Sequence, residues 1–244
     1  MLHELEGTHL RVLGTLHLLP PGGKLPDWLA TAYAWSEAVF VEHSPTDFLL
    51  QARQITAPLD SRVSPAFWQL LNRLTLEAGV AVPLAEFQRG AAVVMAMGCR
   101  IQGIAGADQA LHDWCQRDHK AFGYVEQPAS VLRALEEISE EDWTLAIETE
   151  LARTESPASQ LSQVHGAWVR GETETLEAGT REGLFAVPRV RSALLTGRNR
   201  SWAAAYADPP RRSLMAVGAA HLVGADSFLD ELARVSGRKV RRIA

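Results

Sequence analysis

Hydrophobic residues along the chain form short continuous runs that alternate with longer amphipathic stretches. Four runs are apolar, β-branched or aromatic and are bounded by turn residues or charges, which is typical of buried strands. They cover residues 11–16, 38–41, 121–125 and 213–217. Runs of this kind separated by helical stretches predict an α/β fold with a mainly parallel central sheet flanked by helices. A further run, 238–243, carries four basic residues and predicts an edge strand protected by charge.

The stretches between the runs have helical periodicity. Residues 27–37, 65–78 and 84–104 repeat apolar positions at a spacing of three to four. Residues 130–137 and 140–169 are also predicted to be helical, with Ser139 as the N-cap of the second stretch. The middle of the chain is therefore a large helical insertion between sheet segments. We find no convincing boundary, so the sequence predicts a single domain over residues 1–244.

Composition narrows the class of protein. Of 244 residues, 47% are hydrophobic, and acidic residues outnumber basic ones 29 to 24, so no nucleic-acid partner is expected. The longest weakly polar run, 90–99, has ten residues against about 20 needed for a transmembrane helix, which predicts no membrane segment. Cys99 and Cys115 form neither a disulfide framework nor a C-x-x-C pair. Near the N-terminus, Glu4 and Glu6 stand where a signal peptide would have basic residues. These features favour the cytoplasm.

Charge is distributed unevenly in the helical part. Residues 134–182 hold 12 acids and 3 bases, whereas residues 183–212 hold 6 bases and 1 acid. The simpler interpretation is that the two blocks pack together, with Arg189, Arg191 or Arg200 close to acids of the first block. The alternative is a surface for a charged partner.

A histidine or glutamate follows each of the four predicted strands. His17 and His221 end the segments G-T-L-H and G-A-A-H, and Glu42 and Glu126 follow the second and third strands. Because the carboxyl ends of strands line the ligand crevice in open α/β sheets, we expect these side chains to meet. The glycine three residues before each histidine permits a positive φ and close backbone approach.

Two neutral imidazoles and a carboxylate are a recurrent ligand set for a divalent transition metal. We predict that His17, His221 and Glu42 bind such an ion, with the ring nitrogens of the two histidines within about 5 Å of each other. Glu126 is the second carboxylate. The competing interpretation is structural. In it, each histidine forms a hydrogen bond with the backbone, and Glu42 caps the next helix.

Arg198 and Asn199, in the cluster G-R-N-R, are candidates to bind a substrate carboxylate or to stabilise a developing oxyanion. A guanidinium group is always charged and offers several hydrogen-bond donors in one plane. An ion pair with the acidic block is the structural alternative. The chain has no G-x-S-x-G, H-E-x-x-H, phosphate-loop or G-x-G-x-x-G motif, so several common mechanisms are excluded.

Several segments occur together in a familiar order. They are VLGTLHLLP, AVFVEHS, GADQAL, YVEQP, HGAWVRGETETL, GRNRSWAAAY and GAAHLVGADSFLDEL. With them the chain resembles the TraB/PrgY/GumN family, which includes the Tiki proteins. The resemblance implies a fold shared with erythromycin esterase and ChaN-like proteins, and a metal-dependent hydrolytic site. By it, His17 and His221 match the motif histidines, Glu42 and Glu126 the glutamates, and Arg198-Asn199 the R-N pair.

The resemblance also implies an activity. For Tiki-like members it is a metalloprotease using manganese or cobalt; for the PrgY and TraB branch it is shutdown of a peptide pheromone by cleavage or sequestration. We therefore expect a metal-dependent, metallopeptidase-like hydrolase acting on a peptide or a small amide or ester. Glu126 would be the base or an added ligand, and Arg198 and Asn199 would orient substrate. Zinc also suits these ligands. The alternatives are a non-catalytic protein that sequesters a peptide or haem-like ligand, and an interaction domain using its acidic helices.

Overall fold

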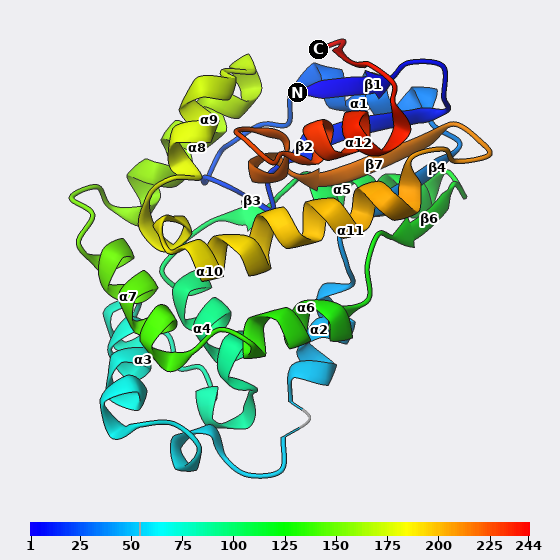
Figure 1. Ribbon diagram of the computed structural model, residues 1–244. Helices are drawn as coiled ribbons and strands as arrows, with labels where there is room; N and C mark the ends of the chain where they lie inside the picture. Colours follow the sequence, from blue (N-terminus) through cyan, green and yellow to red (C-terminus); the bar gives the residue numbers. More distant parts are fainter. Residues whose placement is uncertain (54) are drawn as a thin grey trace.

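A mixed six-stranded sheet organises one end of the molecule in the computed structural model, which describes residues 1–53 and 55–244 (Figure 1). Its four adjacent parallel strands are β6 (Ala121–Tyr124), β4 (Ala38–Val41), β7 (Ser213–Gly218) and β2 (Leu10–Thr15). Beyond β2 lie β1 (Leu2–Leu5), which is antiparallel to β2, and the edge strand β8 (Val240–Arg242), which is antiparallel to β1. The chain thus has an α/β fold whose parallel part contains the four strands predicted from the sequence.

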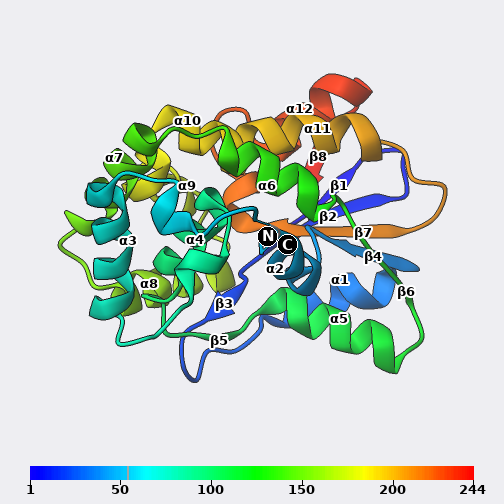
Figure 2. The same cartoon turned by 90° about the horizontal axis from the view of Figure 1, so that it is seen from below.

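Helices cover both faces of the sheet. Figure 2 shows α1 (Asp27–Trp35) and α5 (Ala107–Arg117) on one side, and α11 (Gly197–Tyr206) and α12 (Phe228–Ser236) on the other. Every residue of β7 is buried. This double cover explains why the strands are continuously apolar rather than alternating.

Most of the other helices gather at the other end, below the sheet in Figure 1. They are α2 (Pro45–Ala52), α3 (Pro65–Glu77), α4 (Arg89–Gly98), α6 (Pro128–Glu136), α7 (Glu140–Leu151) and α10 (Pro188–Arg191), with short helical turns at Leu59–Ser61 and Leu84–Glu86. They enclose a second hydrophobic core, in which Phe67, Trp143 and Val190 are almost fully buried. Within the described ranges, no helix is both long and apolar enough to span a bilayer.

Helices α8 (Pro157–Arg170) and α9 (Thr173–Gly179) lie beside the sheet, to its left in Figure 1, and are followed by the short turn η3 (Gly183–Ala186). The single helix predicted over 140–169 is wrong. It divides into α7 and α8, because Pro157 lacks the N–H of a helix interior and instead starts α8 behind the N-cap Ser156.

The helix predicted over 84–104 is also wrong. Only α4 is α-helical in this range. The end of the range begins strand β5 (Ile104–Ala105), which pairs with β3 (Leu18–Leu19). Glycine is a poor helix former, and Gly106 packs so tightly that a Cβ would lie 1.9 Å from the carbonyl oxygen of Leu16. Close pairing with the chain around His17 replaces the helix.

The two oppositely charged blocks pack together, but not through their arginines. Turn η3 and helix α10 contact α7, and the shared core is apolar, including Trp143, Ile147 and Val190. The prediction that Arg200 lies close to acids of residues 134–182 is wrong. Its guanidinium lies 3.4 Å from Glu231, which is outside that block. Among the described residues, neither Arg189 nor Arg191 forms an ion pair. Burial of apolar surface therefore holds the blocks together.

Candidate active site

The two G-x-x-H segments leave neighbouring parallel strands at the same edge of the sheet. Strands β2 and β7 pair in register from Leu10 opposite Ser213 to Thr15 opposite Gly218. His17 follows the first strand, and His221 lies in the short turn η5 (Ala219–Leu222) after the second. The register therefore carries both histidines to one place despite the long chain between them.

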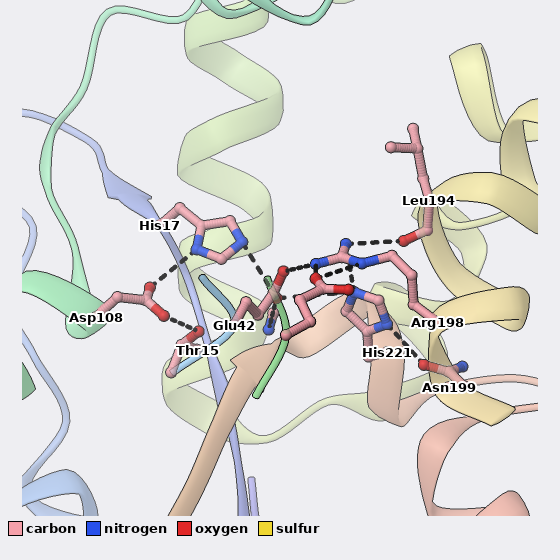
Figure 3. Close-up of polar contacts among 10 residues, drawn as sticks. Thr15, His17, Glu42, Asp108, Leu194, Arg198, Asn199 and His221 are labelled. Atoms are coloured by element: carbon pink, nitrogen blue, oxygen red, sulfur yellow. Dashed lines mark hydrogen bonds and ion pairs between the residues drawn. The ribbon is translucent and has the colours of Figure 1, made fainter. Parts of the chain in front are cut away.

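Glu42 joins the two histidines. It directly follows β4, the other neighbour of β7, and its side chain is buried. Its Oε1 atom lies 3.5 Å from Nε2 of His17 and 3.7 Å from Nε2 of His221 (Figure 3). The same oxygen accepts a hydrogen bond of 2.6 Å from the backbone N–H of Gly218. The predicted convergence is confirmed, and the 5 Å separation of the imidazoles stays a prediction.

His221 is buried and held by Asn199 of α11. Its Nδ1 lies 2.7 Å from the amide oxygen of Asn199, whose Nδ2 donates to the carbonyl of Asp226 at 2.9 Å. That second bond fixes which end of the amide faces the ring. Because an amide oxygen only accepts, Nδ1 of His221 carries the hydrogen and Nε2 presents a lone pair toward Glu42.

His17 is held from the opposite side by Asp108 in the first turn of α5. Its Nδ1 lies 3.0 Å from Oδ2 of Asp108, and the hydroxyl of Thr15 donates to the other carboxylate oxygen at 3.1 Å. The His17 side chain is 60% exposed, so it forms the open side of the site. Asp108 is absent from the site residues predicted from the sequence, although an acidic residue at the start of a helix, in the segment GADQAL, was a usable signal.

Arg198 links Glu42 to Glu126, the last of the predicted carboxylates. Its guanidinium donates to both carboxylates, including a bond of 2.8 Å from Nε to Glu126. Nη1 donates to the carbonyl of Leu194 at 3.1 Å and lies 3.4 Å from Nε2 of His221. The structural alternative for Arg198, pairing with the acidic helical block, is wrong, because its partners are at the strand ends.

These contacts set the charges of the site. Burial would raise the pKa of Glu42, but Arg198 and the two imidazoles outweigh it and hold that pKa well below its usual range. Burial lowers the pKa of His221 to about 3, so its imidazole is neutral at neutral pH. The carboxylate of Asp108, opposed by burial and assisted by Glu42, raises the pKa of His17 well above 6.5. Glu42 is thus ionised and His221 is neutral, as metal ligands need to be, whereas His17 is protonated and would have to release its proton to bind an ion.

The two motif glycines serve close packing. The positive φ anticipated for Gly14 and Gly218 is wrong, since neither is among the glycines with positive φ. A Cβ on Gly218 would lie 3.1 Å from Oε1 of Glu42 and 3.2 Å from Nε2 of His17, in the middle of the cluster. At Gly14 a Cβ would lie 3.1 Å from Leu222. Absence of a side chain, not an unusual backbone, is what these positions require.

The sequence matches the model of the TraB/PrgY/gumN family over residues 1–242. The chain belongs to the TraB/PrgY/gumN family. Searches of curated proteins and of solved structures found no match. In this family member, a cavity of about 310 Å³ opens over His17, Glu42, Arg198 and His221, with apolar walls that include Leu194.

The donor set of this TraB/PrgY/gumN member fits a divalent cation in its chemistry. Nε2 of His221 presents a lone pair, Nε2 of His17 faces the same oxygen, and Oε1 of Glu42 bears negative charge. Across residues 1–53 and 55–244, no three His, Cys, Asp or Glu side chains form an assembled metal cage. Arg198 donates to Oε2 of Glu42, and the N–H of Gly218 donates to Oε1. An ion would therefore bind Oε1 only after small movements of the surrounding groups.

Proposed function

We propose that this chain is a metal-dependent hydrolase acting on a peptide or a small amide or ester. The observation that carries the proposal is the approach of one oxygen, Oε1 of Glu42, to Nε2 of His17 at 3.5 Å and of His221 at 3.7 Å. Two atoms that share an ion through bonds of about 2.1 Å lie roughly 3 to 3.5 Å apart. The two distances from Oε1 are therefore close to those expected around a common ion.

His17, His221 and Glu42 would hold the ion. When bound, a divalent metal supplies a Lewis acid and lowers the pKa of a coordinated water toward neutrality. Asn199 and Asp108 act behind the ligands by fixing the orientation of each imidazole. Manganese or cobalt is proposed from the family resemblance, and zinc suits the same ligands.

Arg198 and Glu126 would assist the reaction. The guanidinium keeps Oε2 of Glu42 turned away from the imidazoles and can stabilise negative charge on the substrate carbonyl oxygen. Glu126 would accept the proton of the attacking water and return it to the leaving nitrogen or oxygen. The bond from the acyl carbon to the leaving atom breaks, and the water oxygen stays on the acyl carbon. Asn199, whose amide is engaged with His221, acts on the imidazole rather than on substrate.

The proposal includes two broader expectations. The fold is taken to be of the erythromycin esterase and ChaN-like type, supported by the parallel order β6-β4-β7-β2 with ligands at the strand ends. A cytoplasmic setting is supported by the two unpaired thiols, Cys99 and Cys115.

A second candidate function is binding without turnover of a peptide or haem-like ligand. It is favoured by Arg198, which already neutralises Glu42 and lies 3.4 Å from Nε2 of His221, so the cluster is satisfied by protein groups alone. In that case ligand would bind in the cavity over these residues and leave unchanged.

Turnover separates the two functions. The purified protein, stripped with a chelator, is assayed on a peptide pool by mass spectrometry with added manganese, cobalt or zinc. The hydrolase proposal expects new peptide termini that appear with metal and disappear with chelator. Bound but intact peptides under every metal condition would overturn it in favour of binding alone.

A further inference from the structure

A second cavity, of about 450 Å³, adjoins the candidate site. It lies between α4, α7 and α8, within the size range of small-molecule pockets. The two cavities share part of their walls. The side chains or backbone that line both belong to Val164, Gly179, Phe185 and Leu194. An extended ligand could therefore occupy both spaces at once, passing these four residues.

The lining of this second cavity is mostly apolar. Trp143, Ala146 and Ile147 of α7 contribute almost fully buried surface. Val94 and Ile101 contribute surface that is 38% and 39% exposed, unusually open for such side chains. Burial of an apolar group here would remove both ligand and protein surface from water.

Two arginines and two glutamates line the cavity, so it has no net charge, and Arg100 is the one of the four without an ion pair among the described residues. Arg153 lies 3.2 Å from Glu182 and 3.9 Å from Glu150, and all three line the cavity. Such pairs leave little net charge to attract a charged ligand. The chemistry of the cavity thus favours an uncharged, apolar occupant.

Leu194 connects this cavity to the reacting groups. It lies in a π-helical turn, η4 (Ser192–Thr196), a local irregularity that is frequent at functional sites. Leu194 lines both cavities, while its carbonyl oxygen accepts the hydrogen bond from Nη1 of Arg198. The residue between the two cavities is therefore hydrogen-bonded to Arg198, whose guanidinium contacts Glu42 and Glu126.

We infer that the second cavity receives a large apolar group attached to the reacting carbonyl of the substrate. The inference rests on the proposed hydrolase function and adds the substrate class: amides or esters whose acyl side is bulky and apolar. A fatty acyl chain and the side chain of a hydrophobic amino acid both have this chemistry. Val94 and Gly179 provide separate tests of the cavity and of its junction with the site.

The cavity itself is tested on metal-free protein with the neutral fluorophore N-phenyl-1-naphthylamine. Val94→Glu places a charge in the lining at a half-exposed position, and we expect it to weaken dye binding at least about tenfold, because the dye would have to desolvate the carboxylate. Val169→Glu is the matched control, a helical valine of nearly equal exposure (39%) outside the cavity, and should bind like the parent. Equal binding by both variants and the parent would overturn the inference.

The junction is tested by cleavage of p-nitroanilides in the presence of manganese. A Cβ on Gly179 meets no atom within 4 Å, and this glycine has no positive φ, so larger side chains enter open space. Full burial of each methylene group of the substrate raises kcat/KM about fourfold. The parent should therefore prefer octanoyl to butanoyl anilide, or N-acetyl-leucyl to N-acetyl-alanyl anilide, at least about tenfold in kcat/KM. Gly179→Leu should abolish that preference, measured as the ratio of kcat/KM for the large and the small substrate, and Gly179→Ala should keep it.

The outcomes distinguish this inference from the function on which it rests. Preference within the acyl pair alone indicates a fatty acyl group, and preference within the peptide pair alone indicates a hydrophobic residue. Cleavage that ignores the size of the apolar group overturns the inference and leaves the hydrolase proposal intact. Cleavage of none of the substrates, with dye binding still sensitive to Val94→Glu, overturns the hydrolase proposal and the substrate assignment together, leaving only an apolar ligand site.

Discussion

Asn199 accepts a hydrogen bond from Nδ1 of His221, and this contact decides what the other ring nitrogen can do. The 2.7 Å bond fixes the hydrogen on Nδ1, so Nε2 faces Glu42 as a lone pair. Asn199 is next to Arg198 on α11, so one helix positions both the imidazole and the guanidinium of the site.

Removing that acceptor should weaken metal binding. Asn199→Leu keeps the branched shape of the side chain but leaves Nδ1 of His221 buried without a partner, and we expect a loss of about 10- to 100-fold in manganese affinity. Asn199→Asp retains an acceptor and should bind within a few-fold of the parent. Manganese titration followed by electron paramagnetic resonance measures both. An unchanged affinity in Asn199→Leu would show that His221 is not a ligand.

The corresponding contact of His17 should matter less. Asp108→Ala removes the carboxylate 3.0 Å from Nδ1 of His17, but this imidazole is 60% exposed and water can replace the lost partner. We expect a smaller loss of manganese affinity than in Asn199→Leu, measured in the same titration. A larger loss would mean that Asp108 holds the ion itself.

Glu42→Gln tests the carboxylate that joins the histidines. The amide can still accept from the N–H of Gly218, and Arg198 retains Glu126, so we expect a stability loss of roughly 1–3 kcal/mol rather than unfolding. Metal-stimulated hydrolysis should fall to background. Thermal melting of the metal-free proteins and the peptide assay check the two parts. If hydrolysis persists, the role passes to Glu126.

The sequence reveals which residues converge, but not everything that supports them. Strand β4 has the predicted bounds because its four residues are uninterruptedly apolar, and the strand ends correctly locate His17, Glu42 and His221. Strand β5 was missed because Ile104 forms a strand only by pairing with Leu19, a partner far away in the sequence. Local periodicity contains no information about such a pairing.

Gly218→Ala should separate folding from ion binding. The backbone at Gly218 has φ −50°, which alanine adopts freely, so the fold should persist. Its methyl group would stand 3.1 Å from Oε1 of Glu42 and 3.2 Å from Nε2 of His17, where an ion would have to bind. We expect circular dichroism like that of the parent together with at least about tenfold weaker manganese binding. Parental affinity would place the ion elsewhere.

A buried histidine outside the site should make the protein sensitive to acid. Burial, together with the amino terminus and Arg242, lowers the pKa of His3 from 6.5 to about 4. The unfolded chain binds this proton first, so stability is full above about pH 6.5 and falls as the pH drops toward 4. His221 acts in the same direction, so the difference between the parent and His3→Gln isolates His3. Chemical denaturation should show that difference changing between pH 6.5 and 4 and constant above it; a constant difference throughout would contradict the assignment.

The most direct test of the metal-dependent hydrolase is the position of the ion. A crystal of the parent protein soaked in manganese, with diffraction recorded near the manganese absorption edge, gives an anomalous difference map. We predict one strong peak about 2.1 Å from Nε2 of His17, Nε2 of His221 and Oε1 of Glu42. A fully soaked crystal with no peak there, or with its strongest peak away from these three atoms, would contradict it.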